Sequence, residues 1–96
     1  MARYIAEHGG SASAFDLDQD IQLVTGIIAW LDAHPATPCW ADYHDELRVR
    51  MVTVRDAWTS ARPDVEAGGL VPADIVLAVS DAANAANDIP APTDCP

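Results

Sequence analysis

Three stretches of this chain carry apolar residues at alternating spacings of four and three, the spacing that places side chains on one face of an α-helix. The first stretch is the series Leu17, Ile21, Val24, Ile28 and Leu31. No stretch of useful length alternates apolar and polar residues in the manner of a half-buried strand. The pattern therefore predicts an all-α fold.

The proline positions indicate where the helices begin and end. Pro35 stops the first helix, because the residue before a proline is kept out of the helical conformation. Thr37 and Pro38 open the second helix as its cap and first residue, and Pro63 ends it. We expect helices at about residues 14–34, 38–61 and 72–89.

The length of 96 residues fits one domain, because a chain this short encloses a single hydrophobic core. Short connections favour antiparallel neighbours, so the fold class expected for residues 1–96 is an antiparallel three-helix bundle. The glycine- and serine-containing residues 1–13 are expected to form a flexible arm, and the proline-rich residues 90–96 a flexible tail.

The apolar stripe along each predicted helix, which we call its seam, also predicts which side chains form the core. The second seam is Trp40, His44, Leu47, Met51, Val54, Trp58 and Ala61, and the third is Ile75, Val79, Ala82, Ala86 and Ile89. Leu23, Ile27 and Trp30 widen the apolar arc of the first helix, which we therefore expect to be the most buried. Core packing, rather than base stacking, is the expectation for Trp30, Trp40 and Trp58.

Charged residues at seven-residue intervals suggest a register between the second and third helices. Three arginines and three aspartates have this spacing: Arg48, Arg55, Arg62, Asp74, Asp81 and Asp88. In an antiparallel pair, Arg62 would meet Asp74, and the other two pairs would follow along the helices.

The charge balance excludes some classes of partner. The net charge is −10 and the chain has no lysine, so direct binding to nucleic acid is not expected, because that affinity comes mainly from lysine and arginine. The sequence shows neither a membrane-spanning stretch nor a secretory signal, which predicts a cytoplasmic protein. Cys39 and Cys95 are accordingly expected to be reduced thiols.

The residue types needed for catalysis or metal binding are present only in unfavourable spacings. His34, Cys39, His44 and Cys95 lack the closely spaced pairs of a structural zinc site, so we expect a helix-end histidine and a hydrogen-bonded histidine at the core edge. Asp42 and Asp45 should point away from His44, which disfavours an acid–base pair. No nucleophile signature or phosphate-binding loop occurs. We expect no catalytic residue, cofactor or metal.

The outward face of the second helix is the predicted partner-binding site. Val49 and Val52 would lie there among acidic residues, an arrangement that a simple bundle does not require. Scattered surface apolarity is the alternative explanation. The residues assigned to this site, including two from the polar side of the first helix, are Asp42, Asp45, Val49, Val52, Asp56, Asp18 and Asp32.

These features lead to the expectation of a small acidic, non-enzymatic protein that binds a basic protein partner. Such a partner is often itself a nucleic-acid-binding protein. Phage inhibitors of host defence complexes, such as anti-CRISPR proteins that mimic nucleic acid, share this general composition. The alternative is a structural or regulatory helical module that homodimerises or serves as an accessory subunit.

Overall fold

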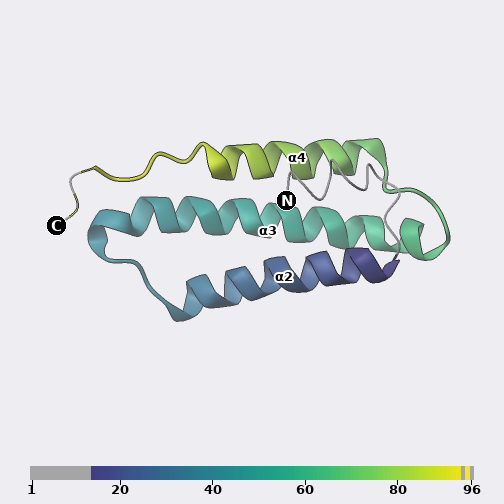
Figure 1. Cartoon of the computed structure of the whole chain (residues 1–96), viewed down its shortest axis with the longest axis horizontal. Helices are drawn as coiled ribbons and strands as arrows, with labels where there is room; N and C mark the ends of the chain where they lie inside the picture. Colours follow the sequence, from purple (N-terminus) through teal and green to yellow (C-terminus); the bar gives the residue numbers. More distant parts are fainter. Residues whose placement is uncertain (1–13, 94, 96) are drawn as a thin grey trace.

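The computed structural model describes residues 14–93 and residue 95. Three α-helices and one short 3₁₀-helix make up this part of the chain: α2 (Ala14–Ala33), η1 (Pro38–Trp40), α3 (Ala41–Glu66) and α4 (Ala73–Asn87) (Figure 1). No strand occurs in the described ranges, so the all-α prediction is confirmed. The expected arm at 1–13 lies outside the described residues.

The long central helix α3 organises the fold. Helices α2 and α4 lie along opposite sides of α3, and successive helices run antiparallel (Figure 1). Both outer helices contact α3, but no Cα atom of α2 comes within 8 Å of a Cα atom of α4. The arrangement is thus more open than a closed bundle in which every helix touches both others, and the molecule measures 50 × 23 × 17 Å.

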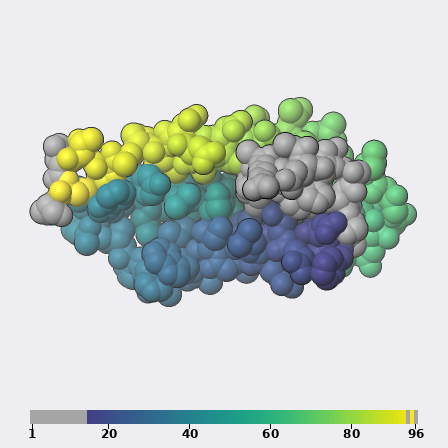
Figure 2. Space-filling view, viewed as in Figure 1, coloured from purple at the N-terminus to yellow at the C-terminus, as the bar shows by residue number. Residues whose placement is uncertain are grey.

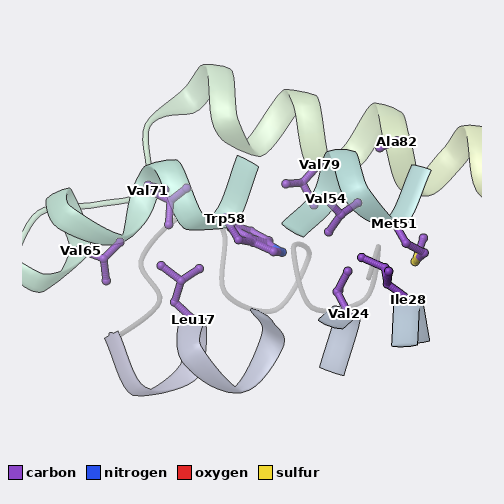
Figure 3. Packing of buried hydrophobic residues seen from close by; sticks show 11 residues of the cluster. Leu17, Val24, Ile28, Met51, Val54, Trp58, Val65, Val71, Val79 and Ala82 are labelled. Atoms are coloured by element: carbon purple, nitrogen blue, oxygen red, sulfur yellow. The ribbon is translucent and has the colours of Figure 1, made fainter. Parts of the chain in front are cut away.

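The core fills the inner sides of all three helices and confirms the predicted seams. Trp58, Leu17, Val24, Val54 and Val79 are the largest side chains that are completely enclosed. Val65 and Val71 extend the cluster past the end of the predicted second helix (Figure 3). Helix α3 contributes to both sides of this core, while the shorter α2 also has five buried residues, Leu17, Asp20, Val24, Ile28 and Leu31.

The outer side of α2 is more exposed than the sequence pattern predicted. Leu23 is 61% exposed and Trp30 is 58% exposed, because α2 contacts only one neighbouring helix in the described structure. Within the described residues, no second helix therefore covers the wider apolar arc. Among the described helices, none has the length and apolar character needed to cross a membrane.

Helix α3 continues through Pro63, where the sequence predicted its end. The proline lacks an N–H donor, which ordinarily costs a helix about 3 kcal/mol. Two contacts beyond it favour continuation: Val65 is buried in the core, and Arg62 Nη1 donates to Glu66 Oε2 at 2.6 Å, one turn apart. Tertiary packing thus overrides the local stop signal.

The reversal after α3 occurs at Gly68 and Gly69, as expected. Gly68 has a φ of +88°, a conformation that side chains with a Cβ rarely adopt. Its backbone N–H donates to the carbonyl of Val65, which closes the helix end. A Cβ added at Gly69 would lie 2.9 Å from the carbonyl oxygen of Asp64, so both glycines are required by the turn.

Candidate functional site

The arginines of α3 pair with α2, not with α4. Arg48 Nε and Nη2 donate to the two carboxylate oxygens of Asp32 at 2.6 and 3.1 Å. Arg62 forms the same bidentate pair with Asp18: its Nε and Nη2 donate to the two carboxylate oxygens at 2.6 and 2.8 Å. The predicted register between arginines of α3 and aspartates of α4 is therefore wrong.

The two bridges fix how α2 lies against α3. Fourteen residues separate Asp18 from Asp32 and fourteen separate Arg48 from Arg62, as an antiparallel pair of straight helices requires. The arginine hydrogen bonds lower the pKa of both carboxyl groups from their ordinary range. Asp18 and Asp32 are thus engaged within the chain, which makes them weaker candidates for a partner surface.

The remaining described arginines are also paired within the chain. Arg50 Nη2 lies 3.3 Å from Glu46 Oε1, and Arg55 Nε lies 3.2 Å from Asp56 Oδ1. All four described arginines consequently have a carboxylate partner on α2 or α3. None of these four arginines is therefore paired with an aspartate of α4.

Helix α4 and its C-cap residue therefore carry an acidic row that none of the described arginines binds, which we define as Asp74, Asp81 and Asp88. All three are exposed, and α4 itself contains no lysine, arginine or histidine. Their seven-residue spacing corresponds to about 10.5 Å along the helix. Leu77, which is 63% exposed, lies between the first two.

The outward face of α3 is smaller than predicted. Asp42, Asp45 and Val49 are exposed, as expected, and Val49 is 57% exposed. Val52 is different: it is half-buried and packs against the core, so its assignment to the outward face is wrong. We call the three exposed aspartates of this face, Asp42, Asp45 and Asp56, the acidic strip.

A cluster of exposed rings lies where α2 turns into α3. Trp30 stacks on His34 with ring centroids 4.3 Å apart, and Trp40 meets Tyr43 edge-on at 5.4 Å and an interplanar angle of 84°. We call these four residues the aromatic corner. The core prediction holds for Trp58, which is 2% exposed, but is wrong for Trp30 and for Trp40, which is 39% exposed.

The aromatic corner surrounds an open pocket of about 380 Å³. Leu31, His44 and Leu47 also line this pocket, together with the connecting residues 35–37. A pocket of this size accommodates a small molecule or a single side chain of a partner. No lysine or arginine contributes to its lining.

Both histidines of this region are bonded to main-chain carbonyl groups, as expected. His34 Nδ1 donates to the carbonyl oxygen of Trp30, and His44 Nε2 donates to that of Leu31, each at 2.8 Å. Each neutral ring therefore keeps its other nitrogen as an acceptor. Asp45 Oδ1 lies 3.6 Å from His44 Nδ1, so the expectation that Asp45 points away from this histidine is wrong.

Cys39 and Cys95 form a disulfide with a Cα–Cα distance of 5.6 Å, which contradicts the expectation of two reduced thiols. The bond joins η1 to the segment that follows α4. Because α4 runs antiparallel to α3, its carboxyl end returns to the start of α3. The segment after α4 (yellow) lies against that end of the molecule in Figure 2.

Residues 14–93 and 95 contain no assembled metal centre. No three histidine, cysteine, aspartate or glutamate side chains there are grouped to hold a metal ion. No protein-family model, curated protein or solved structure matches the chain. The functional proposal therefore rests on the charges and aromatic residues of the described surface.

Proposed function

We propose that this chain is a small, acidic, non-enzymatic protein that acts by binding a basic protein partner. The observation that supports the proposal is the distribution of its charges. The described arginines are bound by carboxylates on α2 and α3, so none of them neutralises the acidic row on α4. A surface of one sign attracts a partner of the opposite sign and speeds their encounter.

The acidic strip on α3 supplies a second anionic surface for the same partner. Asp42 and Asp45 are exposed beside Val49, which gives this face an apolar centre with a charged rim. Asp56 shares its charge with Arg55 and contributes less. Asp18 and Asp32 belong to this proposal only through their solvent-facing portions, because both are bound to arginines.

The partner class proposed is a basic nucleic-acid-binding complex of a host cell, which a phage or mobile-element protein would inhibit by mimicking nucleic acid. Exposed carboxylates in a regular row support this idea because they resemble the anionic backbone that such complexes recognise. The anti-CRISPR class is one example of this mode of action. Cytoplasmic localisation is part of the same proposal.

The disulfide bears on that localisation, because such bonds persist mainly in oxidising compartments. Trapping free thiols with an alkylating agent in intact host cells, followed by mass measurement, reports the state of Cys39 and Cys95 directly. Two alkylated cysteines would support the cytoplasmic proposal. A bridged pair in living cells would contradict it.

A second candidate function is a helical module that forms a homodimer. Exposed Leu23 and Trp30 on the outer side of α2 favour it, because two large apolar side chains lie there and none of the other described helices covers them. Light scattering separates the two candidates: a monomer favours the basic partner, whereas a dimer that Leu23→Asp dissociates favours the module.

Capture of partners from the native host tests the first candidate. We expect wild-type protein to retain basic proteins at about 50 mM salt and to lose them at about 500 mM, where charges are strongly screened. One variant neutralises the acidic row (Asp74→Asn, Asp81→Asn, Asp88→Asn). A second variant removes three charges from the acidic strip (Asp42→Asn, Asp45→Asn, Asp56→Asn).

Both variants remove three negative charges, so a difference between them reports which acidic surface contributes more to capture, rather than the total charge. The proposal expects the row variant to lose the partner at lower salt than the wild type. The proposal would be contradicted if the amount of captured partner changed neither with salt concentration nor in either variant.

A further inference from the structure

Four aromatic residues line the pocket of the aromatic corner. Trp40 meets Tyr43 edge-on at an interplanar angle of 84°, and Trp30 is stacked on His34. The faces of indole and phenol rings carry negative electrostatic potential and attract cations. Trp30 and Trp40 are both accessible for such a contact.

Hydrogen-bond acceptors add to this preference. The donor nitrogens of His34 and His44 are committed to main-chain carbonyls, so His34 Nε2 and His44 Nδ1 remain as acceptors in the neutral rings. The nearest charges are also negative or neutralised: Asp45 lies 3.6 Å from His44, and Arg48 is bound by Asp32. The pocket thus combines ring faces, acceptors and negative potential.

We propose that the pocket of the aromatic corner receives an arginine side chain of the basic partner. This inference rests on the proposed function and specifies how the partner is held. A guanidinium group is planar, so it stacks on Trp30 or Trp40, and its five N–H donors match the histidine acceptors. A lysine ammonium is more strongly hydrated and lacks the planar face.

The disulfide holds one wall of this pocket in place. Trp40 belongs to η1, a three-residue helix with no buried residue and no side-chain cap. Cys39, its immediate neighbour, is bonded to Cys95. Reduction transfers two electrons and two protons from a dithiol reagent to the two sulfurs, and so releases this anchor. Arginine binding should therefore be weaker in the reduced protein.

Nuclear magnetic resonance of the oxidised full-length chain tests the proposal. The three indole N–H signals report on Trp30, Trp40 and the buried Trp58, which serves as an internal reference. The probes are short uncharged peptides with a single central arginine, lysine or citrulline; citrulline has nearly the shape of arginine without its charge. The arginine peptide should shift the Trp30 and Trp40 signals, and leave the Trp58 signal in place.

The dissociation constants decide the outcome. We expect the citrulline and lysine peptides to bind at least about threefold more weakly than the arginine peptide, in line with cation–π energies at partly exposed sites. The assignment would be overturned if the lysine or the citrulline peptide bound as tightly as the arginine peptide, or if only the Trp58 signal shifted. This comparison needs no substitution in the protein, so it does not depend on whether a variant folds.

Substitutions then locate the contact. Trp30→Leu and Trp40→Leu keep an apolar side chain but remove the ring face, and each should weaken arginine binding by about three- to tenfold. Leu23→Ala, on α2 outside the pocket lining, is the matched control and should leave binding unchanged. Unchanged affinity in both tryptophan variants would overturn the proposal.

The inference and the proposed function fail in different ways. Salt-sensitive capture of a basic partner without any arginine-peptide binding would support the function and reject the pocket. Arginine-peptide binding without salt-sensitive capture would support the pocket and reject the function.

Discussion

The Cys39–Cys95 disulfide should make a large contribution to stability. The two cysteines are 56 positions apart, so the bond closes a long loop in the unfolded chain. For a loop of this length, the chain-entropy relation says that the bond removes about 14 cal/mol/K of conformational entropy from the unfolded chain, which corresponds to about 4 kcal/mol of stabilisation at 25 °C. This value is an upper bound, because reduction also gives the segment after α4 more freedom in the folded state.

We therefore expect reduction, or the double substitution Cys39→Ser with Cys95→Ser, to lower the free energy of unfolding by about 2 to 4 kcal/mol. The helices should persist, because neither cysteine belongs to the core cluster. For a domain of this size, such a loss corresponds to a decrease in Tm of more than about 10 °C.

Urea unfolding followed by circular dichroism measures this change in the presence and absence of a dithiol reductant. The double-serine variant is the control, because the reductant has no bond to break in it and should leave its unfolding midpoint unchanged. A loss smaller than about 0.5 kcal/mol in the reduced wild type, well below the typical range, would refute the argument. So would two free thiols in protein purified in air.

Three further outcomes follow from the described contacts. Charge reversal Arg62→Asp should lower the urea midpoint, and adding Asp18→Arg should restore much of the loss, whereas adding Asp74→Arg instead should not, because α2 rather than α4 holds the partner. Because the pKa of Asp18 is lowered in the folded protein, its pairing with Arg62 stabilises the fold above about pH 4, the ordinary range of an aspartate. This contribution is lost as the pH falls further. Urea midpoints measured from about pH 6 to 2 should therefore fall more steeply in the wild type than in Asp18→Asn. Trp58→Ala should cost about 3 to 5 kcal/mol in the free energy of unfolding, while Gly68→Ala should cost about 1 kcal/mol through its strained φ; an equal cost for the two would contradict the burial and backbone arguments.

The sequence was most informative about the helices and their inner faces. The apolar series of α2 and α3 gave Leu17, Val24, Val54 and Trp58 as core residues, and all four are buried. Periodicity specifies the inner face of a helix well, because burial of that face drives folding. It specifies helix ends less well, and the burial of Val65 carried α3 past Pro63.

The charge register could not be decided from spacing alone. Aspartates on both outer helices match the arginines of α3: the seven-residue series on α4 fits them, and the fourteen-residue separation of Asp18 and Asp32 fits Arg48 and Arg62 equally well. Each series is compatible with an antiparallel neighbour. The choice depends on how α3 is rotated about its own axis, which packing determines.

The aromatic corner and the disulfide were missed for related reasons. Trp40 belongs to a 3₁₀ turn, whose three-residue period takes its side chain off the seam extrapolated from α3. Trp30 is exposed because neither α3 nor α4 covers that side of α2. The proximity of Cys39 and Cys95 follows from the antiparallel path of α3 and α4, so combining the predicted topology with the cysteine positions would have revealed it.

The position of the disulfide also determines how the molecule should come apart. The covalent ring that it closes contains α3 and α4, whereas α2 precedes Cys39 and remains outside. Among the described helices, α2 makes non-covalent contacts with α3 alone, so it can detach while the ring stays closed. Amide hydrogens of α2 should therefore exchange with solvent sooner than those of the α3–α4 hairpin, and a pulling force applied to the amino end should release α2 first.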